Sequence, residues 1–159
     1  MKKFLLCMIV LMGMVGSVDA QSVQKKVEVD LSISPAVPCI IGYPGTNVQS
    51  AELAVRYLFG PHFSAGLGIV PTFFDLPINY APLELSFRYN MMPESKLSPY
   101  MLLDFAASFF QLSDYTYRAR FALGVNYQLA PRCSLFAEVG MAAETDAIWW
   151  APVSFGFRF

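Results

Sequence analysis

The last six residues of the chain, Ser154-Phe155-Gly156-Phe157-Arg158-Phe159, place a phenylalanine at every second position. Successive side chains point to opposite faces of a β-strand, so this stretch predicts a strand with one apolar face and one polar face. The C-terminal tails of soluble domains are usually polar and frayed. A chain that ends on a bare phenylalanine therefore raises the question of which face of its last strand meets water.

The composition is unusually apolar for a soluble protein. Of the 159 residues, 55% are hydrophobic, 15% are aromatic and 14% are charged, against a charged fraction of about 25% in typical soluble domains. After residue 20, no stretch approaches the roughly 20 consecutive apolar residues of a transmembrane helix. Apolar residues that are abundant but regularly interrupted favour either a very apolar soluble β-protein or a membrane β-barrel. The length allows one domain.

The N-terminal segment has the order of a secretory signal peptide. Lys2 and Lys3 precede an apolar stretch that runs from Phe4 to Val15, and small residues lead to Ala20 before Gln21. This order predicts export through the inner membrane and cleavage between Ala20 and Gln21, which makes residues 1–20 the signal peptide. The alternative, an uncleaved membrane anchor, needs a longer apolar stretch.

The expected mature chain, residues 21–159, carries nine basic and eleven acidic residues, a net charge of −2. No basic patch indicates nucleic-acid binding. Two cysteines remain, Cys39 and Cys133, and exported proteins often contain disulfides. The strand arrangement given below places these cysteines at opposite ends of the molecule, so we expect no bond between them. Neither has the spacing of a metal site, and we expect no cofactor.

Eight stretches of alternating apolar and polar residues, separated by turn-forming residues, follow the signal peptide. They comprise residues 27–34, 50–59, 63–74, 81–90, 99–110, 115–129, 134–142 and 150–159. Strands of about ten residues match the length that crosses a bilayer at a steep tilt. The pattern predicts an all-β fold, an eight-stranded antiparallel up-and-down transmembrane β-barrel.

The connections between the strands predict the orientation of this barrel. Short turns on the periplasmic side and longer outer loops are typical of transmembrane barrels. With the N-terminus in the periplasm, the outer connections are 34–49, 75–80, 111–115 and 143–148. Cys39 then lies outside and Cys133 inside. Pro71 and Pro152 interrupt strand patterns near the outer rim, where we expect strand pairing to end or bulge.

Charged side chains share one face of the predicted strands, and the other face carries none. The charged face holds Glu28, Asp30, Glu52, Arg56, Glu84, Arg88, Asp104, Arg118, Arg120, Glu138 and Arg158. Five glycines fall on the same face, where they would weaken a solvent-exposed strand with no packing in return. Inside a narrow barrel, however, they leave room for long side chains. We therefore expect a lumen filled by a paired network of six acids and five bases, because buried charges require partners.

Aromatic residues gather near the two ends of the predicted strands. At the periplasmic ends lie Tyr57, Phe59, Phe63, Tyr89 and Tyr127, and at the outer ends lie Phe73, Phe109, Tyr117 and Trp149. Two such groups predict the aromatic girdles of a membrane barrel. Strands favour aromatic residues in any setting, so scattered strand aromatics are the alternative.

On these features the sequence resembles the small eight-stranded outer-membrane β-barrels, the porin-like family of OmpX and the transmembrane domain of OmpA. The resemblance covers essentially the whole mature chain. It implies an outer-membrane location in a Gram-negative cell envelope, with lipid and lipopolysaccharide around the barrel, and a monomer. In this family the assembly machinery reads a terminal strand that ends in phenylalanine. The matching positions here are Val153, Phe155, Phe157 and Phe159.

The sequence favours a role without catalysis. Enzymes among outer-membrane barrels use histidine-containing sites near the outer leaflet, and the single histidine, His62, falls in a predicted periplasmic turn. Three functions stay open: a structural or surface-interaction barrel with a closed lumen, a small porin-like channel for ions or small solutes, and a soluble periplasmic lipocalin-like barrel. Eight strands favour the first, because wide aqueous channels need about sixteen.

Overall fold

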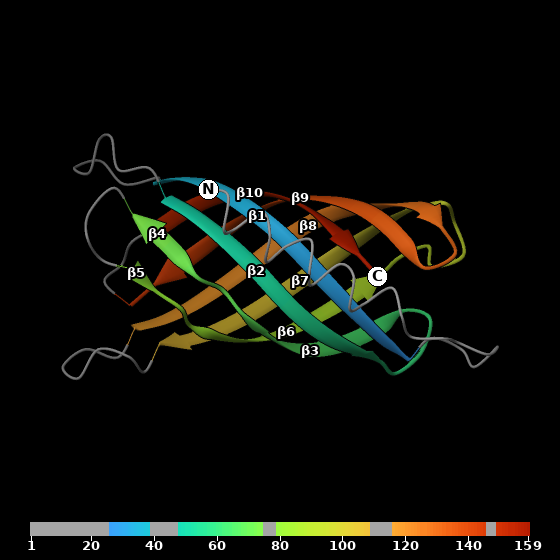
Figure 1. The fold of residues 1–159 in the computed structure, drawn as a ribbon, viewed down its shortest axis with the longest axis horizontal. Coiled ribbons are helices and arrows are strands. Elements are labelled where there is room, and N and C mark those ends of the chain that lie inside the picture. The colour runs from blue at the N-terminus through green and yellow to red at the C-terminus, as the bar shows by residue number, and fades with distance from the viewer. Residues whose placement is uncertain (1–25, 39–47, 75–78, 109–115, 146–148) are drawn as a thin grey trace, which may run out of the picture.

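The computed structural model describes residues 26–38, 48–74, 79–108, 116–145 and 149–159, and these form a single antiparallel sheet that closes on itself (Figure 1). Its strands are β1 (Val27–Pro38), β2 (Val48–Leu58), β3 (Phe63–Ile69), β4 (Thr72–Phe74), β5 (Asn79–Tyr80), β6 (Leu83–Asn90), β7 (Leu97–Ser108), β8 (Thr116–Ala130), β9 (Cys133–Glu144) and β10 (Trp149–Arg158). The first 25 residues, with the expected signal peptide and its cleavage site, lie outside the described residues, as does Cys39.

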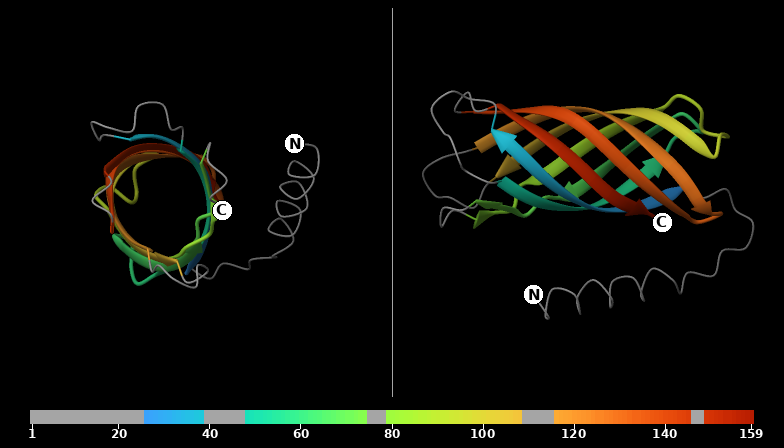
Figure 2. Two further views of the ribbon diagram at one scale, coloured as in Figure 1. Left: turned by 90° about the vertical axis from the view of Figure 1, so that its left-hand side faces the viewer. Right: turned by 90° about the horizontal axis from the view of Figure 1, so that it is seen from above.

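The ten segments make eight barrel strands. β2 pairs with both β3 and β4, which are two parts of one strand, and β5 and β6 likewise continue one another. β1 pairs with β2 on one side and with β10 on the other, which closes the barrel (Figure 2). At the seam, Val29 and Phe159 exchange backbone hydrogen bonds of 3.0 and 2.9 Å. The predicted fold class is confirmed, and the last residue is hydrogen-bonded to β1 rather than frayed.

Proline accounts for the interruptions of the sheet. Pro71 lies in the gap between β3 and β4, because it has no backbone N–H to donate to a neighbouring strand. Its carbonyl still accepts a 3.0 Å hydrogen bond from Ala51. Pro152 stays within β10 and faces Ala36 of β1. On the other side of β10, the pairs with β9 stop at Trp150 and resume at Val153.

We call the end where β1 begins and β10 ends the proximal end, and the opposite end the distal end. The β2–β3, β6–β7 and β8–β9 turns all lie at the proximal end. The distal strand boundaries expected from the sequence were wrong: β1 continues to Pro38, β2 already starts at Val48, and β9 runs to Glu144. Pro35 and Ala36 still pair with Gln49 and Val48 of β2 beyond the expected end of the first strand, so the sheet extends past the alternating pattern.

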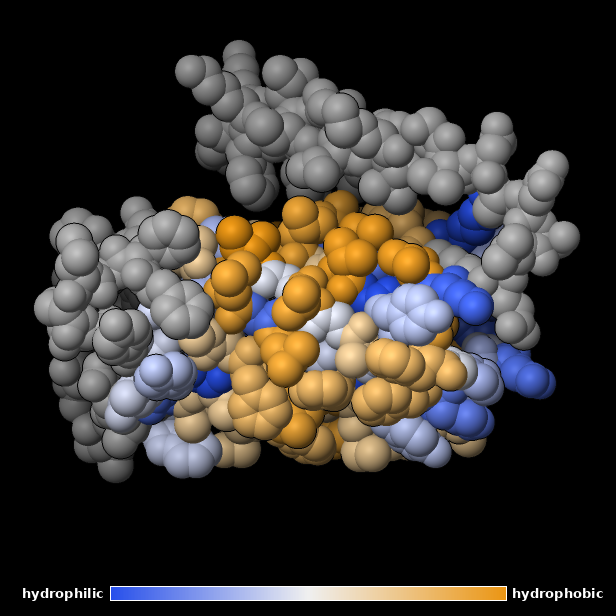
Figure 3. All heavy atoms as spheres, turned by 90° about the horizontal axis from the view of Figure 1, so that it is seen from below, coloured by the Kyte–Doolittle hydropathy of each residue, from blue (hydrophilic) through white to orange (hydrophobic). Residues whose placement is uncertain are grey.

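The outer face of the barrel is a belt of exposed apolar side chains, which Figure 3 shows in orange across the middle of the visible face. Its members include Ile33, Val55, Leu67, Leu83, Phe105, Phe121, Leu123, Val139 and Phe155, which are 40–70% exposed in round numbers. A soluble lipocalin-like barrel would turn this face inward, so that alternative is wrong. Among the described residues, no helix has the length and apolarity needed to span a membrane.

Aromatic side chains border the belt. At the proximal end Tyr57, Phe59, Phe63, Tyr89 and Tyr127 are exposed, and at the distal end Phe73, Tyr117 and Trp149 are exposed. Phe109, expected in the distal girdle, lies outside the described residues. The rings at the proximal end are in contact: the Tyr57 and Phe59 centroids are 5.1 Å apart, and those of Phe59 and Phe63 are 5.8 Å apart. This arrangement suits two membrane–water interfaces.

Candidate functional site

The lumen is the candidate site, and all eleven of the charges assigned to it from the sequence point inward. Nine of these side chains belong to buried residues, while Glu28 and Arg118, near the two ends, are 16% and 12% exposed. The geometry of their ion pairs therefore decides whether the barrel encloses an open passage.

Asp30 of β1 organises the proximal half of the lumen. Its carboxylate accepts hydrogen bonds from three arginines: Arg56, Arg88 at 3.3 Å, and Arg158 at 2.8 and 3.0 Å. Glu28 accepts a further hydrogen bond from Arg88. Buried guanidinium groups are tolerated only when paired and hydrogen-bonded. One carboxylate thus holds side chains from β2, β6 and β10 together on the barrel axis.

Two aromatic rings complete the proximal half. The guanidinium carbon of Arg158 lies 5.1 Å from the ring centroid of Tyr100 and 4.9 Å from that of Phe136. Tyr100 and Phe136 are buried and belong to one apolar cluster with Leu102 and Ala122. The Tyr100 hydroxyl donates a 2.7 Å hydrogen bond to Glu138. Aromatic rings that face a cation stabilise it, and here they also fill the space beside it.

Glycines in the wall make room for these groups. A Cβ on Gly124 would lie 2.4 Å from a ring carbon of Tyr100, and one on Gly156 would lie 2.6 Å from a ring carbon of Phe136. A Cβ on Gly66 would lie 2.5 Å from Cγ of Arg56. A real Cβ essentially never makes contacts this short. At each of these three positions the missing Cβ therefore leaves space that the large inward group occupies. The expectation that wall glycines leave room for large residues is met at these three positions.

In the middle of the lumen, Arg120 of β8 reaches the opposite wall. It donates hydrogen bonds to Asp104 at 2.6 Å and to Glu52 of β2 at 3.1 Å. β8 and β2 are separated by β1, β10 and β9 on one side of the barrel, and by β3, β6 and β7 on the other. Glu52 also accepts a 3.0 Å hydrogen bond from Arg56. Ion pairs therefore connect Arg120, Glu52, Arg56, Asp30 and Arg158 in series across the lumen, and we call this series the central chain.

The distal half contains a separate ion pair. Arg118 donates a 3.0 Å hydrogen bond to Glu84, and among the described residues no ion pair joins these two to the central chain. The other carboxylate oxygen of Glu84 and Nε of Arg118 have no hydrogen-bond partner among the protein atoms described. Trp150, which is buried, donates its indole N–H to Glu144 at 3.2 Å.

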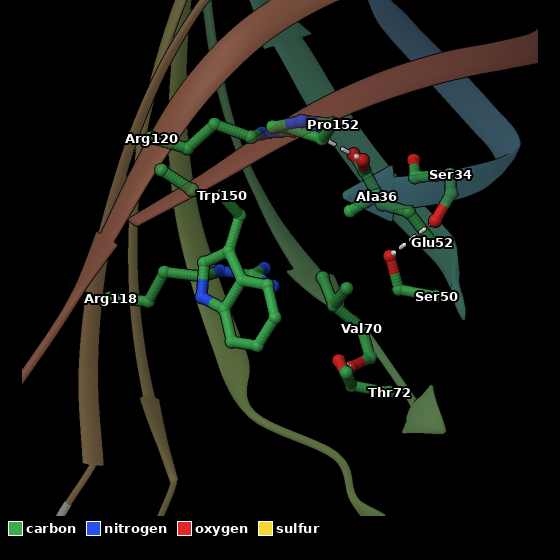
Figure 4. A pocket seen from close by; sticks show the side chains of 11 residues that line it. Ser34, Ala36, Ser50, Glu52, Val70, Thr72, Arg118, Arg120, Trp150 and Pro152 are labelled. Carbon is green, nitrogen blue, oxygen red and sulfur yellow. Dashed lines mark hydrogen bonds and ion pairs between the residues drawn. The ribbon is translucent and has the colours of Figure 1, made fainter. Parts of the chain in front are cut away.

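Two cavities lie on either side of the central chain. The proximal cavity, of about 150 Å³, has a polar lining that includes Glu28, Asn126, Arg132 and Arg158. The distal cavity, of about 30 Å³, has room for about two waters at roughly 10–15 Å³ each. Figure 4 shows Trp150 extending into the distal cavity, which Arg120 and Glu52 close on one side. Asp30 and Arg56 are the two members of the central chain that line neither cavity.

Sequence reasoning missed three large residues that help to fill the lumen: Tyr100, Leu102 and Trp150. Each has the same parity along its strand as the inward charges, since Tyr100 and Leu102 precede Asp104 by even numbers of residues. The alternation alone could have placed them. At the end of β10, Val153, Phe155 and Phe157 are exposed on the outer face and Phe159 is half-buried.

Comparisons with known proteins agree on the fold. No protein-family model matches the sequence, and no curated protein matches it either. Among solved structures, the neisserial surface protein A (NspA) matches with a TM-score of 0.54 at 15% identity, over 83% of this chain and 94% of NspA. The chain has the fold of the small outer-membrane β-barrels.

Two further structures extend this likeness. The N-terminal β-barrel domain of OprF from Pseudomonas aeruginosa matches with a TM-score of 0.51 at 13% identity, over 83% of this chain and 97% of that domain. A transmembrane β-barrel designed de novo matches with a TM-score of 0.53 at 16% identity, over 86% of this chain and 97% of the design. A designed protein and natural ones share this barrel, so a role must be argued from the lumen and the surfaces of this chain.

Proposed function

We propose that the protein is a monomeric outer-membrane β-barrel whose lumen is closed by its own ion pairs, and that it acts as a structural or surface-interaction protein. The observation that carries this proposal is the chain Arg120–Glu52–Arg56–Asp30–Arg158, which crosses the barrel between opposite walls. Each side chain in it is buried. An ion that moved through the lumen would have to displace paired charges from one another.

The outer-membrane location is part of the proposal. The exposed apolar belt and the two aromatic borders support it, because such surfaces are stable against lipid and unstable against water. The proximal end then faces the periplasm, and the distal end faces lipopolysaccharide and the surroundings of the cell. We propose that Val153, Phe155, Phe157 and Phe159 form the signal that the barrel-assembly machinery reads before the barrel closes.

We also propose that the protein is not an enzyme. His62 lies in the proximal turn, where its Nδ1 is 2.9 Å from the carbonyl oxygen of Asn90 and its ring stacks on Tyr89 with centroids 5.7 Å apart. The ionisable groups of the lumen are engaged with one another in pairs. Such pairs account for the charges without assigning any of them to a substrate.

A small channel is the second candidate, and a specific observation favours it. The two cavities extend into the lumen from opposite ends. Asp30 and Arg56, which form an ion pair, lie between the residues that line one cavity and those that line the other. If this pair opened, the cavities would join. The lumen would then pass ions or small solutes.

Conductance of the refolded protein in planar bilayers separates the two candidates. We expect wild-type protein to give no conductance steps. An Arg118→Ala/Arg120→Ala variant should conduct ions, because removing Arg120 breaks the series of ion pairs where it meets β8. Lys26→Ala, which removes an exposed charge outside the lumen, is the matched control and should be as silent as wild type. Discrete, reproducible steps from wild-type protein would contradict the closed lumen and identify a small pore.

A further inference from the structure

The exposed basic side chains in the described part of the chain all lie at one end of the barrel. Among the described residues they are Lys26, Lys96 and Arg132, and each is exposed at the proximal end. Lys26 directly precedes β1, Lys96 directly precedes β7, and Arg132 lies in the turn between β8 and β9. One exposed acid, Glu94, shares this end. The proximal rim therefore carries three exposed basic side chains and one exposed acid among the described residues, and the acid shares the β6–β7 turn with Lys96.

The distal end carries the opposite charge. Glu144 ends β9 there. In the sequence, the stretches that join strands at this end add Asp75, Asp114 and Asp146 but no lysine or arginine. Within the described residues, the exposed basic side chains therefore lie at the proximal rim only.

Lys96 is held where a lipid headgroup would lie. Its Nζ is 5.3 Å from the ring centroid of Tyr127, an exposed residue of the proximal aromatic border. Leu97, which faces Tyr127 across the β7–β8 pair, and Leu129 are each 54% exposed beside it. A cation fixed over an interfacial tyrosine, next to exposed leucines, presents a charge to the headgroup layer and apolar surface to the acyl chains.

We propose that the proximal rim binds the phosphate groups of anionic phospholipids, with Lys96 over Tyr127 as the principal contact and with Lys26 and Arg132 completing a basic collar. The inference rests on the membrane location proposed above. A phospholipid is the occupant, rather than free phosphate, because the collar adjoins the apolar belt and the exposed leucines would otherwise lie against water. Basic residues beside an anionic membrane surface attract it by about 1 kcal/mol each, which is about five-fold in affinity.

The collar predicts lipid selectivity that can be measured directly. The protein is refolded into phosphatidylcholine vesicles with and without phosphatidylglycerol, released in mild detergent, and analysed by native mass spectrometry for the lipids that stay bound. We expect wild-type protein to retain phosphatidylglycerol in preference to phosphatidylcholine, and glycerol phosphate added in solution not to compete. Lys96→Gln should lower this preference about five-fold, and Lys26→Gln/Lys96→Gln/Arg132→Gln should abolish it.

Matched variants separate charge from folding. Lys96→Arg keeps the charge and should keep the preference, while Glu94→Gln removes the one exposed acid of the rim and should not lower it. Heat-dependent gel migration identifies the folded variants. Equal retention of both lipids by wild-type protein, or an unchanged preference in the folded triple variant, would overturn the inference. Failure of wild-type protein to enter vesicles at all would instead contradict the membrane location.

Discussion

The two halves of the lumen are built from the same strands and the same alternation, yet they are packed differently. In the proximal half, Asp30 accepts hydrogen bonds from three arginines, and Arg158 lies near the rings of Tyr100 and Phe136. In the distal half, Arg118 and Glu84 form a separate pair that no ion pair among the described residues connects to the central chain. Inward-facing charge alone therefore does not determine how the lumen is filled. The proximal half also has charges that share partners and rings that occupy the space beside them.

Removing Asp30 should have the largest effect, because it leaves three buried arginines without their common acceptor. We expect Asp30→Ala to lower the free energy of unfolding by about 3–5 kcal/mol, the usual effect of removing one partner from a buried ion pair. Urea unfolding of the refolded protein measures it. Ser32→Ala changes the next inward residue of β1 and is the control, with an expected loss below about 1 kcal/mol. Equal losses in both variants would show that Asp30 is not the organising residue.

Filling a wall glycine tests the packing of the proximal half. Gly124→Val would drive side-chain atoms into the ring of Tyr100, so we expect a loss of about 1–3 kcal/mol in the free energy of unfolding. Gly60→Ala, in the β2–β3 turn, is the matched control because nothing lies within 4 Å of the Cβ it would add. If Gly124→Val unfolds at the same urea concentration as wild-type protein, the packing of Tyr100 does not depend on a glycine at this position.

The distal pair should matter less. Glu84→Gln keeps an acceptor for Arg118 but removes the charge, and one oxygen of Glu84 has no partner to lose. We expect a loss of about 1 kcal/mol, well below that of Asp30→Asn measured in the same way. A distal loss as large as the proximal one would remove the distinction between the two halves.

A similarly small effect should come from Trp150. Trp150→Phe keeps a ring in the distal cavity and removes the indole N–H that donates to Glu144, so we expect a loss of about 0.5–1.5 kcal/mol. Trp149→Phe, on the outer face of the same strand, is the control and should change stability less. The reverse order would indicate that the outer tryptophan, rather than the lumen, stabilises the distal end.

The sequence predicted the wall of the barrel better than its filling. The alternation of residues in each strand placed every lumen charge on the inward face, because the side-chain period of a strand is a local property. It did not predict which charges pair. Arg120 and Glu52 lie 68 residues apart, and they meet only because the stagger of eight strands brings them to one level. The distal boundaries were missed for the same reason, since pairing with β2 extends β1 past its alternating pattern.

Conductance of Asp30→Ala compared with Glu84→Ala in planar bilayers tests the central claim most directly. Asp30 belongs to the chain that separates the two cavities, whereas Glu84 does not. If this chain closes the lumen, Asp30→Ala gives discrete steps, and both Glu84→Ala and wild-type protein stay silent. Silence in a folded Asp30→Ala barrel, or steps from Glu84→Ala alone, would contradict a lumen closed by the central chain.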